Sequence, residues 1–319
     1  MEQEVVKGAS LWRDAWKRLL KNKLAVFGMV VIGIMIVAVI VGPAIIRWTT
    51  GFTYDYIPSN VGNGDLVRSF PPSWQHPMGT DDSGRDLLAR VLQGGRISLM
   101  VGIISTLVSL IIGVSYGATA GYLGGRVDNF MMRIVDIIYS IPYILIVIVL
   151  LSFFGGPNTP EWIQSMAGTF GGGQGLSQIF LLFFALGLVS WLTMARVVRG
   201  QVLSLKNQEF VLAARATGVS TPAIIFRHLV PNALGPVIVY ATLTVPSVML
   251  SEAFLSFLGL GVQAPYASWG SLASDGIKNI AIYPWQLIFP GVTMALTLFS
   301  LNFLGDGLRD ALDPQTRKF

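Results

Sequence analysis

Cysteine is absent from the chain, and charged residues occupy only 12% of its 319 positions. The lack of cysteine excludes disulfides, cysteine-bound metals and thiol chemistry. Soluble domains carry a charged fraction of about 25%, and a soluble core of this size does not need 53% hydrophobic residues. Together with a mean hydropathy of +0.63, this shortage of charge predicts a polytopic membrane protein.

The chain also lacks motifs for nucleotide binding and catalysis. It has no Gly-x-x-x-x-Gly-Lys-Ser/Thr loop, which excludes nucleotide binding through a P-loop. The stretch Gly259-Leu-Gly261-Val-Gln-Ala264 matches a dinucleotide fingerprint by letter, but no strand precedes it. His76 and His228 fall on opposite sides of the membrane in the layout below, so they cannot form a metal pair or a dyad. We therefore expect no catalytic residue, bound metal or cofactor on this chain.

Long apolar runs account for the composition. A membrane-spanning helix needs about 20 consecutive apolar residues, and six segments meet this requirement. They are residues 24–46, 97–122, 134–154, 177–195, 232–256 and 284–305. The third has Arg133 and Asp136 at its start. We predict an all-α polytopic membrane protein with six transmembrane helices, which places both chain ends on one side.

The distribution of basic residues predicts which side that is. With the N-terminus inside, the cytoplasmic segments hold 16 of the 22 Lys and Arg residues, and most of the others lie in the long 47–96 loop. Cytoplasmic loops of membrane proteins are enriched in Lys and Arg, and long loops count least in this rule. We therefore expect a cytoplasmic segment at 1–23, an external loop at 47–96 and a cytoplasmic tail at 307–319.

Segment 1–23 is predicted to contain an amphipathic helix that suits the membrane interface. Apolar residues recur there at helical spacing, opposite a basic face. They are Leu11, Trp12, Ala15, Trp16, Leu19 and Leu20. The alternative is a frayed basic leader. The 24–46 run that follows is too long for the core of a cleavable signal and predicts a retained anchor.

The second half of the external loop, from His76 to Arg96, predicts a short helix that leads into the second span. Asp81, Asp82 and Asp86 do not have the spacing of a calcium loop, so we expect them to cap this helix.

The second span carries a glycine at every fourth residue. These are Gly113, Gly117, Gly121 and Gly125. A ridge of small residues lets a neighbouring helix approach closely, although glycine is common in membrane helices in general.

The spans contain almost no ionisable side chain. Glu252, near the outer end of the fifth span, is the only candidate well inside. Ionisable groups at membrane depth mark ion or substrate pathways. For Glu252 a solute gate, an interhelix hydrogen bond and local packing are all open. The spans therefore resemble a passive path whose energy comes from elsewhere.

Residues 209–231, between the fourth and fifth spans, predict a helical corner. One helix face would carry Phe210, Ala213, Ala214 and Thr217. Gly218 can end this helix in the left-handed conformation. Ser220 or Thr221 can cap a second short helix, with Pro222 in its first turn. On the cytoplasmic face, such a corner suits the docking of a partner that supplies energy.

This segment resembles the EAA loop of type I ABC importer permeases, whose pattern is Glu-Ala-Ala, three residues, Gly, nine residues and Ile-x-Leu-Pro. The residues at the spacing of the pattern are Ala213, Ala214, Gly218 and Pro231. Leu212 stands where the pattern has Glu, and His228 and Val230 stand where it has Ile and Leu. Glu209 lies one turn upstream of Leu212.

Other segments resemble the C-type subunit of dipeptide and oligopeptide permeases. They are residues 11–32, His76-Pro-Met-Gly-Thr-Asp-Asp-Ser-Gly-Arg-Asp, Arg96-Ile-Ser-Leu, and the run from Ser251 to Pro265 with Ser268-Trp-Gly behind it. The resemblance covers nearly the whole chain. It implies the type I ABC importer permease fold, with a permease core at 97–306 that contains a coupling loop at 206–231.

The resemblance also implies a transport subunit rather than an enzyme. Its partners would be a homologous B-type permease in a heterodimer, two ATP-binding subunits that hold ATP and Mg, and an external solute-binding protein, with no nucleic acid. The location would be a bacterial inner or plasma membrane, with several spans in the lipid bilayer. Dipeptides or oligopeptides are the expected cargo, while similar permeases carry nickel complexes or small glycans.

In permeases of this kind, the coupling loop sits in a groove of one ATPase and carries its movement to the spans, which switch from inward-facing to outward-facing. The roles implied are Ala213 and Ala214 for close approach, Gly218 for the corner, Arg215 and Glu209 for polar contacts, and Pro231 as the end of the motif. The competing class is an ion- or proton-coupled carrier that acts alone. An intramembrane enzyme is excluded because nucleophiles, bases and metal ligands are not clustered.

Overall fold

The computed structural model describes residues 11–57, 68–154, 161, 165 and 174–312, and this part of the chain is almost entirely helical. Five of its helices are long and apolar enough to cross a membrane, and a bent pair of helices brings the number to six if the pair is counted as one span. These helices are α2 Lys23–Thr50, α3 Leu87–Leu123, the pair α4 Gly125–Ser140 and α5 Tyr143–Phe154, α7 Gln174–Leu205, α10 Val230–Phe257 and α12 Trp285–Leu312. The predicted all-α architecture is confirmed for the described residues, and the six predicted spans correspond to five candidate spans and the bent pair.

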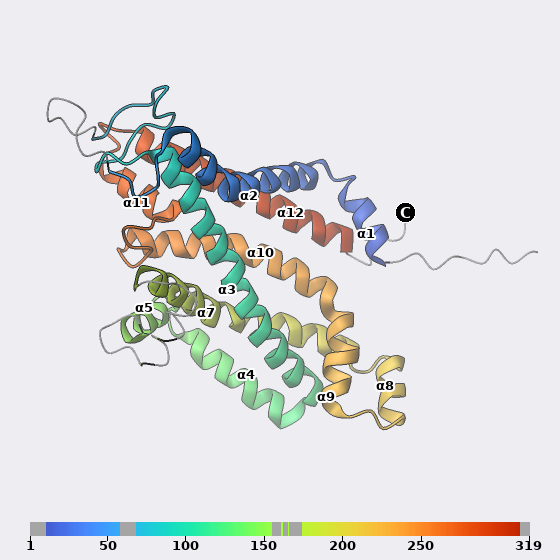
Figure 1. Ribbon diagram of the computed structural model, residues 1–319. Helices are drawn as coiled ribbons and strands as arrows, with labels where there is room; N and C mark the ends of the chain where they lie inside the picture. The colour runs from blue at the N-terminus through green and yellow to red at the C-terminus, as the bar shows by residue number, and fades with distance from the viewer. Residues whose placement is uncertain (1–10, 58–67, 155–160, 162–164, 166–173, 313–319) are drawn as a thin grey trace, which may run out of the picture.

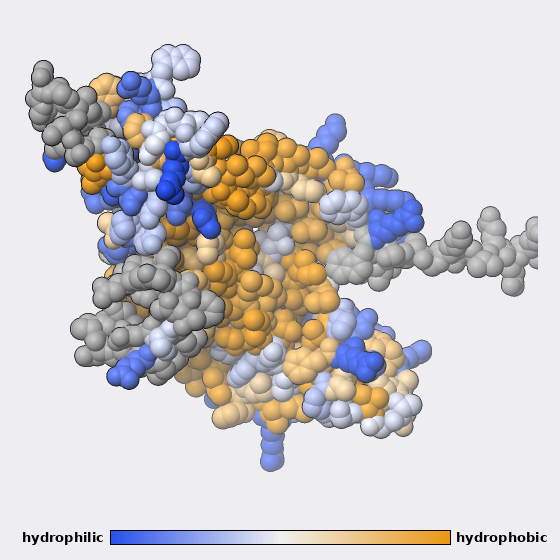
Figure 2. Space-filling view, in the orientation of Figure 1, coloured by the Kyte–Doolittle hydropathy of each residue, from blue (hydrophilic) through white to orange (hydrophobic). Residues whose placement is uncertain are grey.

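Successive crossings run in alternate directions, so that α2 begins and α12 ends at the same end of the bundle (Figure 1). That end also carries α1, Leu11–Leu19, and the short helices α8 and α9 between α7 and α10. The opposite end carries α11, Trp269–Lys278, and the connection from α2 to α3. Figure 2 shows an apolar band across the middle of the face in view, with polar residues gathered at both ends of that face. This distribution suits a bundle embedded in a bilayer.

The third predicted span, 134–154, is wrong as a single helix. α4 ends at Ser140 and α5 begins at Tyr143, and the two helices are bent by 86° relative to each other. Pro142 lies between them. Proline has no N–H and disfavours helical backbone in the residue before it, and Ile141 is extended here. The apolar run continues across the break, which is why hydropathy alone joins the two helices.

The predicted short helix after His76 is the beginning of α3 rather than a separate element. α3 starts at Leu87, where Asp86 caps it by accepting the N–H of Ala89 at 2.8 Å. The sequence predicted this stretch to belong to the external loop because charged residues occur early in α3. Arg90 is tolerated on a buried side of the helix because its Nη1 donates to Oδ2 of Asp81 at 2.6 Å.

Helix α11 was not predicted, because its ten residues are too few for a span. Ser268 and Ser271 form a reciprocal capping box at its start, a pattern that the sequence does contain. Trp269 is fully buried, and its indole N–H donates to the carbonyl of Val91 at 2.8 Å. α11 is thereby attached to the first turns of α3.

The helices α3 and α7 cross at close range. Three of the predicted ridge glycines lie on this contact: Gly113, Gly117 and Gly121. A Cβ at Gly117 would collide with the carbonyl of Ala195, and one at Gly121 would lie 3.0 Å from the carbonyl oxygen of Arg199. Gly125 does not belong to this ridge. It has a positive φ of 56° at the start of α4, and a Cβ there would meet no atom within 4 Å.

The N-terminal helix α1 packs on the ends of α2 and α12. Ala15 and Leu19 are buried in a small cluster with Ala25 and Ala311, whereas Trp16 is 54% exposed. The helix predicted within this segment is therefore present at Leu11–Leu19, with Ala15 and Leu19 on its inner side. Residues 1–10 of the predicted N-terminal segment, and residues 313–319 of the predicted tail, lie outside the described part of the chain.

Candidate functional site

The segment between α7 and α10 forms a helical corner at the end of the bundle that carries α1 (Figure 1). Helix α8, Glu209–Ala216, leads to Gly218, where the backbone turns with a φ of 74°. A left-handed backbone costs a residue with a Cβ about 1–2 kcal/mol, so glycine suits the turn. Ser220 occupies the N-cap position of α9, Thr221–Ala223, although its side chain makes no capping hydrogen bond, and Pro222 lies in the first turn.

The second arm of the corner is not the separate short helix that the sequence predicted. α9 continues through a π-helical turn, Ile224–Leu229, into α10, so that Thr221–Phe257 form one helical run of 37 residues. In the π turn the N–H of Val230 donates to the carbonyl of Ile225. Pro231 has no N–H, and its ring would crowd the carbonyl four residues earlier in an α-helix. The wider π turn accommodates it.

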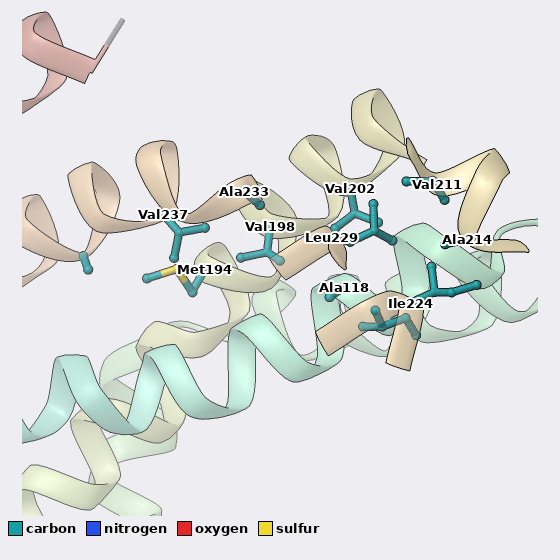
Figure 3. Packing of buried hydrophobic residues seen from close by; sticks show 12 residues of the cluster. Ala118, Met194, Val198, Val202, Val211, Ala214, Ile224, Leu229, Ala233 and Val237 are labelled. Atoms are coloured by element: carbon teal, nitrogen blue, oxygen red, sulfur yellow. The ribbon is translucent and has the colours of Figure 1, made fainter. Parts of the chain in front are cut away.

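An apolar core holds the inner side of the corner against the spans (Figure 3). It joins α3, α7, α8, the π turn and α10 through Ala118, Met194, Val198, Val202, Val211, Ala214, Ile224, Ile225, Leu229, Ala233, Val237 and Ala241. Val211 and Leu229 are fully buried, and Ala214 is 8% exposed. Helix α8 is therefore packed firmly onto the spanning helices.

The structure divides the predicted face of α8 between the inner and the outer side of the corner. Ala214 points into the protein's own core, while Ala213 is exposed. Because Ala214 is covered by the chain's own core, only Ala213 of the two alanines is left at the surface. The exposed side instead carries Ala213 with Phe210.

Three large apolar side chains are exposed at the corner and were not recognised from the sequence as a group. Phe210 is 38% exposed, Leu212 is 49% exposed, and Phe226 in the π turn is 52% exposed. Leu212 is the residue at the Glu position of the EAA pattern. Large apolar side chains that lie together at the surface can form an interaction surface. The signal available in the sequence was the apolar pair Phe210 and Leu212 on either side of the buried Val211.

The two polar residues predicted for the corner have different environments. Nη2 of Arg215 lies 3.4 Å from the hydroxyl of Tyr122 at the end of α3, and the guanidinium lies 5.5 Å from the centre of that ring. Glu209 is exposed in the first turn of α8, where a negative charge stabilises the helix dipole. Arg215 is therefore oriented by α3, while Glu209 extends outward.

Two ion pairs attach α4 to α7 near the same end of the molecule. Arg199 donates through Nε and Nη2 to the two carboxylate oxygens of Asp128, at 2.5 and 2.7 Å. Arg196 donates to Asp136 at 2.7 Å. The bidentate geometry of the first pair makes it both strong and directional. These charges hold α4 in place where it makes little apolar contact with α7.

Glu252 is enclosed rather than presented to a path. Its carboxylate is 1% exposed, and Oε1 accepts hydrogen bonds from Ser256 at 2.7 Å and from Ser268 at 2.6 Å. The second bond joins α10 to the start of α11. Of the three roles open for Glu252, the geometry matches the interhelix hydrogen bond.

Among the described residues, no group of three or more His, Cys, Asp or Glu side chains could hold a metal ion. His76 is paired through Nδ1 with Asp86 at 2.8 Å, within the cap of α3. The prediction that all three aspartates cap the helix is wrong for two of them. Asp81 accepts the N–H groups of Ser83 and Arg85 within the loop, and Asp82 accepts hydrogen bonds from Asn279 and Gln286.

A helical membrane bundle with an anchored helical corner at one end is the architecture expected of a membrane transport permease. The chain belongs to the family of binding-protein-dependent transport system inner membrane components, whose model matches residues 110–318. Residues 10–66 match the N-terminal transmembrane domain of oligopeptide transport permease C.

The curated relatives agree over nearly their full length. The oligopeptide transport system permease protein OppC of Haemophilus influenzae is 46% identical, covering 99% of this chain and 93% of that protein. OppC of Bacillus subtilis is 45% identical over 98% of this chain and 92% of that protein. The dipeptide transport system permease protein DppC of Bacillus subtilis is 43% identical over 99% and 90%. The chain is thus a permease subunit of an ABC importer, which decides against a carrier that acts alone.

The fold is also found in a solved structure. An inward-facing conformation of the MetNI methionine ABC transporter superposes with a TM-score of 0.50 at 18% identity, covering 70% of this chain and 96% of that chain. This similarity supports the type I importer permease fold.

Proposed function

We propose that this chain forms, together with a homologous B-type permease, the transmembrane path of an ATP-driven importer of dipeptides or oligopeptides. The names of the relatives support peptide as the cargo. The observation that carries the coupling role is the two-sided corner. Val211 and Ala214 attach it to the spans, while Phe210 and Leu212 are left exposed at its surface.

Two cytoplasmic ATP-binding subunits would hold ATP and Mg, and the corner would dock in a groove of one of them. Phe210, Leu212 and Ala213 supply an apolar contact surface, and Glu209 and Arg215 supply polar contacts at its edge. The helical run from Thr221 to Phe257 has 37 residues and bends between α9 and α10 (Figure 1). Because this run begins at the corner, a displacement of the docked helix reaches the far side of the membrane through one continuous element. Gly218 sets the angle between the two arms, and Pro231 shapes the π turn behind it.

We assign the end with α1 and the corner to the cytoplasm, and the end with α11 to the outside, where a solute-binding protein would deliver the cargo. The excess of Lys and Arg in the short loops and terminal segments of the first end supports this orientation. The protein would then reside in a bacterial inner or plasma membrane with both termini in the cytoplasm.

The test is transport by the complete complex in liposomes. The two permeases and two ATP-binding subunits are reconstituted with the external binding protein, and uptake of a radiolabelled tripeptide is measured. We expect uptake that requires both Mg-ATP and the binding protein. Uptake driven by an ion gradient without the ATP-binding subunits would contradict the proposal. A nickel complex and a small glycan, offered in the same assay, distinguish peptide from the other cargo classes.

A further inference from the structure

Two adjacent cavities lie along α7 and α10, beside the break between α4 and α5. The first has a volume of about 400 Å³ and is bounded by residues of the break, among them Tyr139 and Pro142. The second has a volume of about 260 Å³ and extends along α10. Both are lined by Ser190, Thr193 and Ser251, so they are two parts of one groove.

A stripe of hydroxyl side chains follows this groove. On α10 it consists of Tyr240, Thr244, Ser247 and Ser251, and on α7 of Ser190 and Thr193. The intervals of three and four residues place each set on one helix face. Polar side chains within membrane helices usually face the bundle interior or a water-filled cavity. The stripe therefore marks a polar surface rather than a lipid-facing one.

The three serine hydroxyls of the stripe have already used their protons. Ser190 donates to the carbonyl of Leu186 at 2.9 Å, Ser247 to that of Leu243 at 3.1 Å, and Ser251 to that of Ser247 at 2.9 Å. A serine hydroxyl has one proton and two acceptor lone pairs. What these three serines offer to the groove is therefore their hydrogen-bond acceptors.

The groove is also free of charge. Among the described residues that line the two cavities, none is ionised at neutral pH. The nearby Arg196 is held by Asp136, and its guanidinium lies over the ring of Tyr139, 4.3 Å from the ring centre. A neutral surface of acceptors has no charged group with which to select or trap a charged cargo side chain.

We infer that this groove, which we call the hydroxyl groove, is this chain's half of the peptide path and that its acceptors receive backbone N–H groups and the terminal ammonium of the passing peptide. The inference rests on the proposed function, because it names the cargo groups that this surface contacts. All peptides share these donors, so the groove accepts peptides irrespective of their side chains. Single neutral hydrogen bonds are weak enough for the cargo to leave again.

Cysteine scanning tests the position of the groove, because the chain has no cysteine of its own. Ser247→Cys and Ser251→Cys are introduced singly into the complete complex and labelled with a small, water-soluble methanethiosulfonate. Ser115→Cys is the matched control, since Ser115 makes the same bond to the carbonyl four residues back but lines neither cavity. We expect labelling rates at least tenfold above the control that change between the nucleotide-free and vanadate-trapped states. Rates equal to those of Ser115→Cys, or independent of nucleotide state, would overturn the inference.

Removal of the acceptors tests their role. The triple variant Ser190→Ala/Ser247→Ala/Ser251→Ala lacks the three serine acceptors. Each lost hydrogen bond lowers the affinity of the groove for the peptide about fivefold, so we expect tripeptide uptake to fall about tenfold or more. The rate of ATP hydrolysis stimulated by the binding protein should stay within twofold of that of the parent complex. The variant Ser190→Thr/Ser247→Thr/Ser251→Thr, which retains the hydroxyls, should recover most of the uptake. Normal uptake by the triple Ala variant would overturn the inference while ATP-driven peptide uptake by the parent complex stands. Absence of uptake by the parent would instead reject the proposed function.

Discussion

The hydroxyl of Ser268 donates to Oε1 of Glu252 across 2.6 Å, and this bond joins the outer end of α10 to the first turn of α11. The same oxygen accepts the hydroxyl of Ser256 within α10. A single buried acceptor thus holds two helices in register near the end of the molecule that we place outside the membrane. It lies at the opposite end of the helical run that begins at the coupling corner.

Glu252→Ala should destabilise the permease by about 3 kcal/mol, because it leaves a cavity and two buried hydroxyls without their acceptor. Glu252→Gln retains an oxygen in the same place and should cost about 1 kcal/mol. The midpoint of thermal unfolding of the purified complex in detergent measures the difference. An Ala variant as stable as the Gln variant would show that the bond to Ser268 is unimportant.

Gly218→Val should uncouple ATP hydrolysis from transport without preventing membrane insertion. Open space surrounds Gly218, so the penalty comes from its φ of 74° rather than from a clash. We expect a strain of about 1–2 kcal/mol and a shift in the angle between the arms. Peptide uptake and the abundance of the subunit in membranes are the two readouts. Gly200→Val is the matched control, because Gly200 lies in α7 with equally open space and without a positive φ. Equal uptake by the two variants would contradict a special role for the corner.

Leu212→Asp and Val211→Asp should separate docking from folding. Leu212 is 49% exposed, so its replacement should leave the permease folded but reduce co-purification of the ATP-binding subunits severalfold. Val211 is fully buried, and a carboxylate there should cost several kcal/mol of stability in the permease itself. Affinity purification followed by thermal unfolding resolves the two effects. Full retention of the ATP-binding subunits by Leu212→Asp would argue against the exposed face of α8 as the docking surface.

Gly117→Ala should destabilise the bundle by about 1–3 kcal/mol, because its methyl group would collide with the backbone of Ala195 and force α3 away from α7. Gly33→Ala in α2 is the matched control, since no atom lies within 4 Å of its added Cβ. An alanine in an open helical site is favourable by up to about 1 kcal/mol. The midpoints of thermal unfolding of the two variants should therefore shift in opposite directions, down for Gly117→Ala and up for Gly33→Ala.

Local sequence features predicted much of the molecule. The apolar runs located all the crossings because the bilayer demands about 20 apolar residues in each. Gly218 and Asp86 were placed correctly because a left-handed turn and a helix N-cap depend on the residue itself and its near neighbours. The break at Pro142 had the same local cause but was hidden by a hydropathy that continues through it.

What the sequence by itself determined is the class of membrane protein, the six crossings and the position of the corner, since each depends on composition or on contacts within a few residues. Only the tertiary structure decided which way the corner's side chains point. Val211 and Ala214 turned inward because Val202, Ile224 and Leu229, from other parts of the chain, form an apolar surface beneath them. Likewise, only the structure shows that Glu252 lies against Ser268 and that the hydroxyls of α7 lie beside those of α10. These relationships require helices distant in sequence to pack together, and helical periodicity gives no information about which helix will be the neighbour.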